Sequence, residues 1–329
     1  MKIAVVILNW NGVNLLEQFL PSVIKYSEEA TVYVADNAST DDSVAFVKRT
    51  FPSVKIIQNT ENGGYAKGYN DALKHIEADA FCLLNSDIEV TKNWLTPIIE
   101  TFKSEKETAI IQPKILDFKK KTYFEYAGAG GGFIDKYAYP YCRGRIFNTI
   151  EEDLNQYNNS INIFWASGAC LFIRSAVYKE LEGLDEYFFA HMEEIDLCWR
   201  AKNHGHTVKY VGLSKVYHVG GATLTTLNPK KTYLNFRNSL FMLTKNSKDF
   251  LFGIIIVRLC LDGIAGLKFL FELKPKHCLA IIKAHFSYYI QLKRLLAKRK
   301  STKRNVKHYT IKSIVLNYYL LNKKKYSGL

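Results

Sequence analysis

The sequence predicts an α/β fold with a mostly parallel sheet flanked by helices and a helical, basic extension at the C-terminal end. Three observations predict it. Apolar runs of strand length alternate with helix-like stretches over the first 115 residues. Polar residues follow the ends of these runs. The excess of positive charge lies after residue 271.

The five apolar runs are β-rich and nearly continuous, as expected for strands buried on both faces of a parallel sheet. They are Ile3–Leu8, Thr31–Ala35, Val54–Ile57, Ala80–Leu84 and Ala109–Ile111. Helix-like stretches lie between them, and capping residues precede two of these stretches. The stretches are 13–25, 41–49, 65–77 and 91–103. Such alternation predicts parallel strands joined by right-handed crossovers.

Four consecutive strand ends carry acidic or amide side chains. They are Asn9–Asn11, Asp36–Thr40, Asn59–Gly64 and Asn85–Glu89. Turn chemistry explains any one of them, but four in a row describe one polar edge, where open parallel sheets bind ligands. The loop after the first strand lacks the G-x-G-x-x-G of dinucleotide-binding domains. Without a glycine cradle, a divalent metal held by carboxylates such as Asp87 and Glu89 could neutralise a diphosphate.

Composition separates a neutral body from a basic tail. The 329 residues are 48% hydrophobic and 23% charged, which excludes a disordered or fibrous chain. The net charge is +14, and residues 272–329 hold 15 Lys/Arg and one acid. The six cysteines have no metal or redox spacing, so we expect buried free thiols in a reducing compartment. The apolar N-terminal stretch is too short for a signal peptide, so we expect a cytoplasmic first strand.

Residues 250–271 are long enough to span a bilayer at about 20 residues. Arg258 and Asp262 lie near the middle, however, and central charges cost about 2.5–3.5 kcal/mol each. With Lys268 they fall within an arc of about 120° on a helix. We therefore expect an amphipathic helix in the membrane interface or packed on the body, with a spanning helix as the alternative. The basic stretches 292–304 and 323–325 suit an anionic cytoplasmic leaflet.

Seven segments, in order, resemble the family 2 glycosyltransferases with the GT-A fold, in particular their rhamnosyltransferase-like branch. The segments are VVILNWNG (5–12), VADNASTDDS (34–43), NTENGGYAKGYNDAL (59–73), LLNSDIEV (83–90), WASGACLFIR (165–174), GLDEYFFAHMEEIDLCWR (183–200) and VYHVGG (216–221). The resemblance implies a Rossmann-like GT-A domain over 1–245, with a nucleotide-binding half (1–115) and an acceptor half (116–245). Residues 246–329 would form the membrane-associating tail.

The activity that the resemblance implies is an inverting, metal-dependent transfer of one sugar. The donor would be a UDP- or dTDP-linked sugar, and the acceptor a hydroxyl of a glycan or lipid-linked molecule in cell-surface polysaccharide synthesis. Processive synthases of this superfamily carry Q-x-x-R-W, whereas here only Trp199-Arg200 occurs, in reversed order. We therefore expect one sugar to be transferred per encounter.

The resemblance assigns the nucleotide sugar to residues at the polar edge. These are Asn9, Asp36, Asn62, Lys67, Asn85, Ser86 and Asp87. Asp87 matches the second acid of the family's D-x-D motif and would hold Mg²⁺ or Mn²⁺ on the diphosphate. The first position is Asn85, which removes one negative charge. His218 stands where related enzymes place another metal ligand.

The segment from His191 to Asp196 holds three acids within four residues at the start of a helix-like stretch, where the helix dipole favours them. By resemblance one of them is the base that takes the acceptor proton. Glu194 matches it best, Glu193 is the alternate, and we expect Asp196 to be structural. Direct displacement needs one carboxylate base and inverts the anomeric centre. A hydrolase layout would also need an acid on the leaving oxygen.

The acceptor side is predicted from the segment that precedes the acids. Trp165, Ser167 and Gly168 would line it, with Trp165 as a surface for sugar stacking. Residues 117–160 match the family least and are rich in Tyr, Gly and Asn. We expect them to form a mobile loop over the site that sets acceptor choice.

Other classes of function account for fewer of these features. The tail could bind nucleic acid through its cations, but no nucleic-acid fold motif accompanies it and the body is neutral. A nucleotidyltransferase would carry a basic triphosphate loop after the first strand, and an inactive sugar-binding relative is a further alternative. We expect a peripheral protein on the cytoplasmic face of an anionic membrane, with no nucleic-acid partner.

Overall fold

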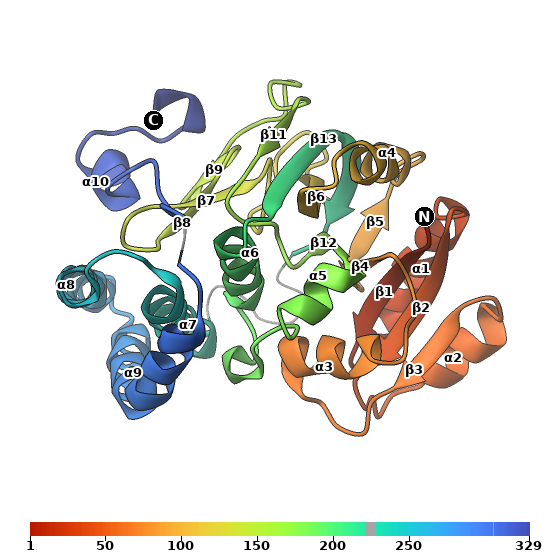
Figure 1. Cartoon of the computed structure of the whole chain (residues 1–329), viewed down its shortest axis with the longest axis horizontal. Helices are drawn as coiled ribbons and strands as arrows, with labels where there is room; N and C mark the ends of the chain where they lie inside the picture. Colours follow the sequence, from red (N-terminus) through yellow and green to blue (C-terminus); the bar gives the residue numbers. More distant parts are fainter. Residues whose placement is uncertain (221–227, 305) are drawn as a thin grey trace.

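A computed structural model describes residues 1–220, 228–304 and 306–329, so Gly221 of the VYHVGG segment lies outside it. Its centre is a sheet with the strand order β11-β13-β6-β12-β4-β1-β2-β3, and β5 pairs with β13 (Figure 1). The strands are β1 (Ile3–Asn9), β2 (Ala30–Asp36), β3 (Lys55–Gln58), β4 (Ala80–Asn85), β5 (Ile88–Val90), β6 (Thr108–Asp117), β11 (Ser160–Asn162), β12 (Cys170–Arg174) and β13 (Thr207–His218).

The sheet is parallel in the half that the sequence predicts. β1 pairs in parallel with β2 and β4, and β2 pairs in parallel with β3. β12 is inserted antiparallel between β4 and β6, while β6 and β13 run in parallel. The predicted α/β fold is therefore confirmed. Four of the five predicted strands occur close to their expected bounds, whereas the fifth, expected at Ala109–Ile111, extends to Asp117.

Helices cover both faces of the sheet. Residues of β1 alternate between two hydrophobic clusters, with Ala4 and Val6 in one and Val5 and Ile7 in the other. This alternation explains why the strand sequences are apolar at nearly every position. The helices of the first 203 residues are α1 (Val13–Lys25), α2 (Ser43–Thr50), α3 (Gly64–Leu73), α4 (Thr96–Ser104), α5 (Ser175–Glu180) and α6 (Glu193–Asn203). Four of them match the predicted stretches, but α4 begins later than expected because Pro97 occupies its first turn.

The expectation that the stretch 117–160 is a loop is wrong, while its part in acceptor choice stays a prediction. Much of it folds into a second, antiparallel sheet in the order β10-β9-β8-β7, in which Tyr141 and Ile146 are buried. The strands are β7 (Gly132–Ile134), β8 (Pro140–Cys142), β9 (Arg145–Ile146) and β10 (Thr149–Ile150). Its glycines serve close packing, because a Cβ on Gly132 would lie 2.1 Å from Cε2 of Trp165.

The C-terminal part is helical, as predicted, and is packed on the body. It contains α7 (Pro229–Asn246), α8 (Leu251–Phe271), α9 (Pro275–Ser301) and α10 (Ile314–Tyr319). The predicted boundary at residue 245 falls in the last turn of α7, which packs along α9. Four of the cysteines are buried as expected, but Cys260 on α8 is exposed and Cys278 is half-buried.

Two of the three charges in α8 point toward the body, whereas Lys268 is exposed and pairs with Glu272. Arg258 and Asp262 are buried and pair at 2.8 Å. Arg258 also donates to the carbonyl of Tyr137, and the Tyr139 hydroxyl donates to Asp262. These contacts agree with the expected docked helix. Within the described ranges, the structure holds no helix with the length and apolar character needed to cross a membrane.

Candidate active site

The loops after β1 and β2 form one buried polar pair. Nδ2 of Asn9 donates to Oδ1 of Asp36 at 3.1 Å, and the backbone N–H of Ser39 donates to the other oxygen at 3.0 Å. Oδ1 of Asn9 has no hydrogen-bond partner within the described part of the chain. Gly12 lies against it, since a Cβ there would stand 2.5 Å from this oxygen. Two residues expected to bind the nucleotide are thus brought together, and one buried acceptor oxygen is left without a partner among the described residues.

Asn37 connects the second and third strand ends, and the sequence analysis missed it. Its Nδ2 donates to Oδ1 of Asn62 at 2.9 Å, and its Oδ1 accepts from Asn59 at 3.1 Å. Asn62 in turn accepts from the backbone N–H of Gly64. The only sequence signal was its place next to Asp36 in the VADNASTDDS segment. Asn37 therefore holds Asn62 in place beside the Asn9–Asp36 pair.

Lys67 on α3 forms ion pairs with Asp71 and, at 3.4 Å, with Glu61. Its predicted contact with the donor stays a prediction. The loop after β3 approaches the segment before α6 at Gly64, whose backbone φ of +74° favours glycine. A Cβ there would lie 2.6 Å from the carbonyl oxygen of Phe189, which accepts from the N–H of Tyr65. The loop after β3 thus lies directly against the segment that precedes α6.

The ends of β4 and β13 place the predicted metal ligands together. Nε2 of His218 lies 3.1 Å from Oδ1 of Asp87 and 3.5 Å from Nδ2 of Asn85. Its Nδ1 lies 3.3 Å from Oε2 of Glu125. Burial by itself lowers the pKa of His218, but hydrogen bonds to Asp87 and Glu125 outweigh burial and raise it to about 10. Ser86, between the two motif positions, is half-buried and lies near Gly12.

Glu125 was missed because it lies in the stretch that matches the family least. It is buried beside His218, and its carboxylate also accepts from the backbone N–H of Ala127 at 2.6 Å. The sequence offered no signal beyond an acid between two aromatic residues. Glu89 lies elsewhere, in an ion pair with Lys121 at 2.6 Å.

The donor set at Asp87 and His218 fits a metal that is shared with a diphosphate. The carboxylate of Asp87 and the imidazole of His218 lie 3.1 Å apart, and Mg²⁺ or Mn²⁺ commonly combines few protein ligands with phosphate oxygens and water. Across the described residues, no group of three or more His, Cys, Asp and Glu side chains could hold a metal ion. The residues therefore fit a metal that arrives with the nucleotide and not a closed protein cage.

Asp196 is structural, as expected. It is fully buried and pairs with Arg200 at 2.8 Å and with Lys245 at 2.9 Å, while Asn246 donates to it at 2.7 Å. Lys245 also pairs with Asp185 at 2.6 Å. This network ties α7 to the beginning of α6.

Glu193 and Glu194 differ from Asp196 because they lack such partners. Oε2 of each is buried with no hydrogen-bond partner in the described part of the chain, and the same holds for Nε2 of His191. Burial raises the pKa of Glu194 to about 7, and burial together with the charge of Glu194 raises the pKa of Glu193 well above its usual range. Glu194 is partly exposed, whereas Glu193 is 4% exposed. Glu194 is thus the more accessible of the two acids, and its pKa lies near neutral pH.

The loop before these acids is strained and clamped. Phe189, His191 and Met192 have φ between +64° and +72°, and non-glycine residues in sparsely populated conformations cost about 1–3 kcal/mol each. Nδ2 of the buried Asn238 on α7 lies within 3.0 Å of the carbonyl oxygens of Phe188, Ala190 and His191. No sequence pattern indicates this role, because Asn238 lies within an ordinary helical stretch.

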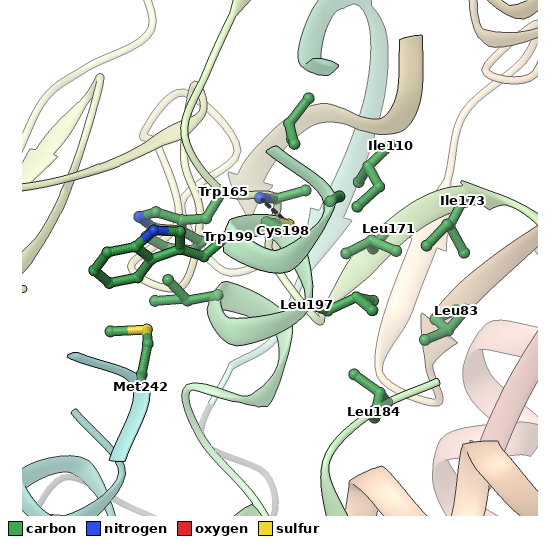
Figure 2. Close-up of a cluster of buried hydrophobic side chains, with 14 of the residues drawn as sticks. Leu83, Ile110, Trp165, Leu171, Ile173, Leu184, Leu197, Cys198, Trp199 and Met242 are labelled. Atoms are coloured by element: carbon green, nitrogen blue, oxygen red, sulfur yellow. Dashed lines mark hydrogen bonds between the residues drawn. The ribbon is translucent and has the colours of Figure 1, made fainter. Parts of the chain in front are cut away.

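Of the three residues predicted to line the acceptor side, Gly168 lies beside the acids, whereas Trp165 and Ser167 are buried. Gly168 adjoins the acids, because a Cβ there would lie 3.8 Å from Cβ of Glu194, and its carbonyl accepts from the Tyr65 hydroxyl at 2.7 Å. Trp165 is not a sugar-stacking surface, and this expectation is wrong. It is 2% exposed, donates to the carbonyl of Phe133 and lies with Trp199 in the core (Figure 2). Ser167 is likewise buried, and its N–H donates to Gln112.

Comparison with known proteins places this arrangement in a family. Residues 4–181, more than half of the chain, match the family Glycosyl transferase family 2. The chain is similar to the N-acetylglucosaminyl-diphospho-decaprenol L-rhamnosyltransferase of Mycobacterium tuberculosis, with 22% identity over 218 residues. This match covers 62% of this chain and 71% of the relative.

Two solved structures share the fold. The mannosyltransferase PcManGT from Pyrobaculum calidifontis, in complex with GDP-Man and Mn²⁺, has a TM-score of 0.55 at 12% identity, over 87% of this chain and 86% of that one. S. aureus TarS 1–349 in complex with UDP-GlcNAc has a TM-score of 0.57 at 16% identity, over 91% and 84%. The chain therefore belongs to glycosyl transferase family 2, as a rhamnosyltransferase-like glycosyltransferase with the GT-A fold.

Proposed function

We propose that this chain is an inverting, metal-dependent glycosyltransferase that transfers one sugar from a UDP- or dTDP-linked donor. The acceptor is a hydroxyl of a glycan or lipid-linked molecule in cell-surface polysaccharide synthesis. The observation that carries the proposal is one unpaired carboxylate oxygen on each of Glu193 and Glu194 at the start of α6. Glu194 adjoins Gly168, and the next residue, Ala169, accepts from the N–H of Asn85 at the strand end that leads to Asp87 and His218. The relative named for a diphospho-decaprenol acceptor and the structures with nucleotide sugars support it.

The donor binds along the polar edge. Asn9 and Asp36 receive the base and ribose, because one buried Asn9 oxygen has no partner among the described residues, and Asn62, Asn85 and Ser86 complete the pocket. Asp87 and His218 hold Mg²⁺ or Mn²⁺, which when bound supplies the positive charge that a departing diphosphate needs. Asn85 contributes an amide where the family has a carboxylate, so the site carries one negative charge fewer.

Glu194 acts on the acceptor. Its carboxylate takes the hydroxyl proton while the acceptor oxygen bonds to the anomeric carbon and the bond from that carbon to the diphosphate breaks. The nucleophile and the leaving group lie on opposite faces of the sugar, so the anomeric configuration inverts. Glu193 keeps its proton because burial raises its pKa and a charged Glu194 lies beside it. Gly168 lies next to Glu194 and leaves room for the acceptor.

We also propose that the protein works as a peripheral protein on the cytoplasmic face of an anionic membrane. The supporting observation is the charge of residues 272–329, which hold 15 Lys/Arg and one acid. Each basic residue near an anionic surface contributes about 1 kcal/mol of attraction. A lipid-linked acceptor would be reached from this position.

A thermal-shift measurement tests the donor and metal assignments. We expect UDP or dTDP with Mn²⁺ to raise Tm, because a ligand at about 100 times its Kd stabilises the folded state by about 2.7 kcal/mol. ATP with Mn²⁺ is the control, and it should raise Tm less. A shift of the same size with EDTA in place of Mn²⁺, or with ATP, would contradict the assignment.

Asn238→Ala tests the clamp on the strained loop. We expect kcat to fall about 10- to 100-fold, because a displacement of about 1 Å in the reacting groups can cost that much. Nucleotide affinity should stay within about twofold, since Asn238 contacts the loop before α6 and not the donor edge. Asn235→Ala, partly exposed on the same helix, is the matched control. Equal losses in kcat and in nucleotide affinity would point to general unfolding instead of positioning.

A further inference from the structure

The outer face of α8 is apolar and uncovered. Phe252, Ile264, Leu267 and Phe271 have exposed fractions of 68%, 62%, 56% and 87%. At 100° per residue these side chains lie within an arc of about 120°, and no charged residue of α8 falls in it. Monomeric soluble proteins seldom expose a continuous apolar surface of this kind without a binding role.

The neighbouring helix α9 extends this face. Leu279, Phe286 and Ile290 are 50%, 67% and 78% exposed, while Ala284 and Tyr288 on its opposite side are buried. The two helices pack against each other, since a Cβ on Gly266 would lie 3.5 Å from Sγ of Cys278 and the ring of Phe269 stacks on His277 at 5.0 Å. Figure 1 shows α8 and α9 at the end of the molecule away from β3 and α2.

The inner face of α8 explains how charges occur in the middle of such a helix. Arg258 and Asp262 are 2% and 0% exposed and pair with each other. The Tyr139 hydroxyl and Nε2 of His285 reach Asp262 at 2.7 and 3.3 Å. The charged groups are therefore satisfied by protein on the body side, and the outer side is left free to contact an apolar medium.

The positive charge around this face favours an anionic bilayer over a second copy of the chain as its partner. Lys276, Lys283 and Lys293 are exposed on α9, within a tail that holds 15 Lys/Arg and one acid. A second copy of the chain would bring the same positive charge against it, and like charges repel. A bilayer with anionic headgroups offers apolar chains to the face and negative charge to its lysines.

We propose that α8 and α9 form a lipid-inserting hairpin whose outer face enters the boundary between headgroups and acyl chains. Charge attracts the tail to the surface, and apolar contact then holds it there. The biological role of this insertion rests on the proposed function, because a lipid-linked acceptor would reach Glu194 from the same bilayer. It differs from electrostatic adsorption in one measurable respect, namely binding that survives at high salt.

Fluorescence quenching tests insertion directly in the full chain. We expect Phe286→Trp to be quenched by anionic phosphatidylglycerol vesicles that carry bromine on the acyl chains. Leu213→Trp on β13 is the matched control, because Leu213 is 73% exposed in a different part of the molecule and should add no quenching. Equal quenching of the two variants, or none in either, would overturn the inference.

Vesicle flotation at high salt gives a second measurement. At about 0.5 M salt, exposed charges are screened within a few ångströms, so wild-type binding that remains is apolar. We expect Phe252→Gln/Phe271→Gln/Phe286→Gln to lower this binding about tenfold or more, and Leu154→Gln/Leu213→Gln, two exposed leucines elsewhere, to leave it unchanged. Wild-type binding that vanishes at high salt would overturn insertion and leave electrostatic adsorption.

Two further readouts separate this inference from the proposed function. Sedimentation without vesicles should show a monomer, and a dimer that the triple variant dissociates would assign the face to a second copy and overturn the lipid occupant. The thermal shift with UDP and Mn²⁺ should be the same in the triple variant and the wild type. If that shift is absent in both while flotation behaves as expected, the donor assignment fails and the lipid-inserting hairpin stands.

Discussion

Glu194→Gln is expected to slow sugar transfer by about 10²–10⁴-fold, the usual contribution of a positioned general base. Glutamine keeps the size of the side chain and can still hydrogen-bond, but it cannot take a proton. Nucleotide affinity in the presence of Mn²⁺ should be nearly unchanged. Asp87 and His218 lie at the ends of β4 and β13, whereas Glu194 lies on α6. The measurement is transfer rate against nucleotide affinity in the same preparations.

Glu193→Gln is the matched control for that variant. Its effect should be smaller, since Glu193 is buried and its raised pKa keeps it protonated. A reversal, with Glu193→Gln inactive and Glu194→Gln active, would move the base by one residue and keep the mechanism. A product with retained anomeric configuration would contradict single displacement altogether.

The pH dependence of the wild type follows from the same side chain. Burial raises the pKa of Glu194 to about 7, and only the ionised carboxylate can accept a proton. The rate should therefore rise with pH up to about 7 and level off above it. The charge that Glu194 gains also raises the pKa of its neighbours Glu193 and Tyr65. The Glu194→Gln variant should lose this dependence.

Asp87→Ala should abolish turnover and remove the dependence of nucleotide binding on Mn²⁺. Asp87 is the carboxylate that faces Nε2 of His218 at 3.1 Å, and Asn85 brings no charge to compensate for its loss. Turnover and a Mn²⁺ titration of nucleotide affinity are the two measurements. His218→Ala should weaken metal-dependent binding less, because an imidazole is neutral when it ligates a metal.

Glu89→Ala provides the control for this second variant. Glu89 lies two residues after Asp87 and forms an ion pair with Lys121, so its loss should change turnover little. Full wild-type activity in the presence of EDTA would remove the metal from the mechanism. A Glu89 effect as large as that of Asp87 would mean that the metal ligand had been assigned to the wrong acid.

The sequence alone was sufficient for the parallel half of the sheet and for the edge where the site lies. The runs Ile3–Leu8 and Ala80–Leu84 are apolar at every position, and such runs between helical stretches specify buried parallel strands. Once the strands are parallel, the residues that follow them must share an edge. The proximity of Asn9 to Asp36 and of Asp87 to His218 agrees with the segments that resembled the family.

Tertiary structure decided the positions that depend on partners far away in the chain. Trp165 carries no local sign of burial, and the backbone of Gly132 covers its ring. Glu125 contacts His218, about 93 positions away, and Asn238 donates to the carbonyl of His191, about 47 positions away. No local sequence pattern encodes contacts over such separations. Arg258 and Asp262 of α8 could face water or protein, and only the contacts with Tyr137 and Tyr139 turned them inward, while Lys268 of the same arc stays exposed. Local patterning determines which elements form, whereas burial and pairing of single side chains depend on which distant elements pack against them.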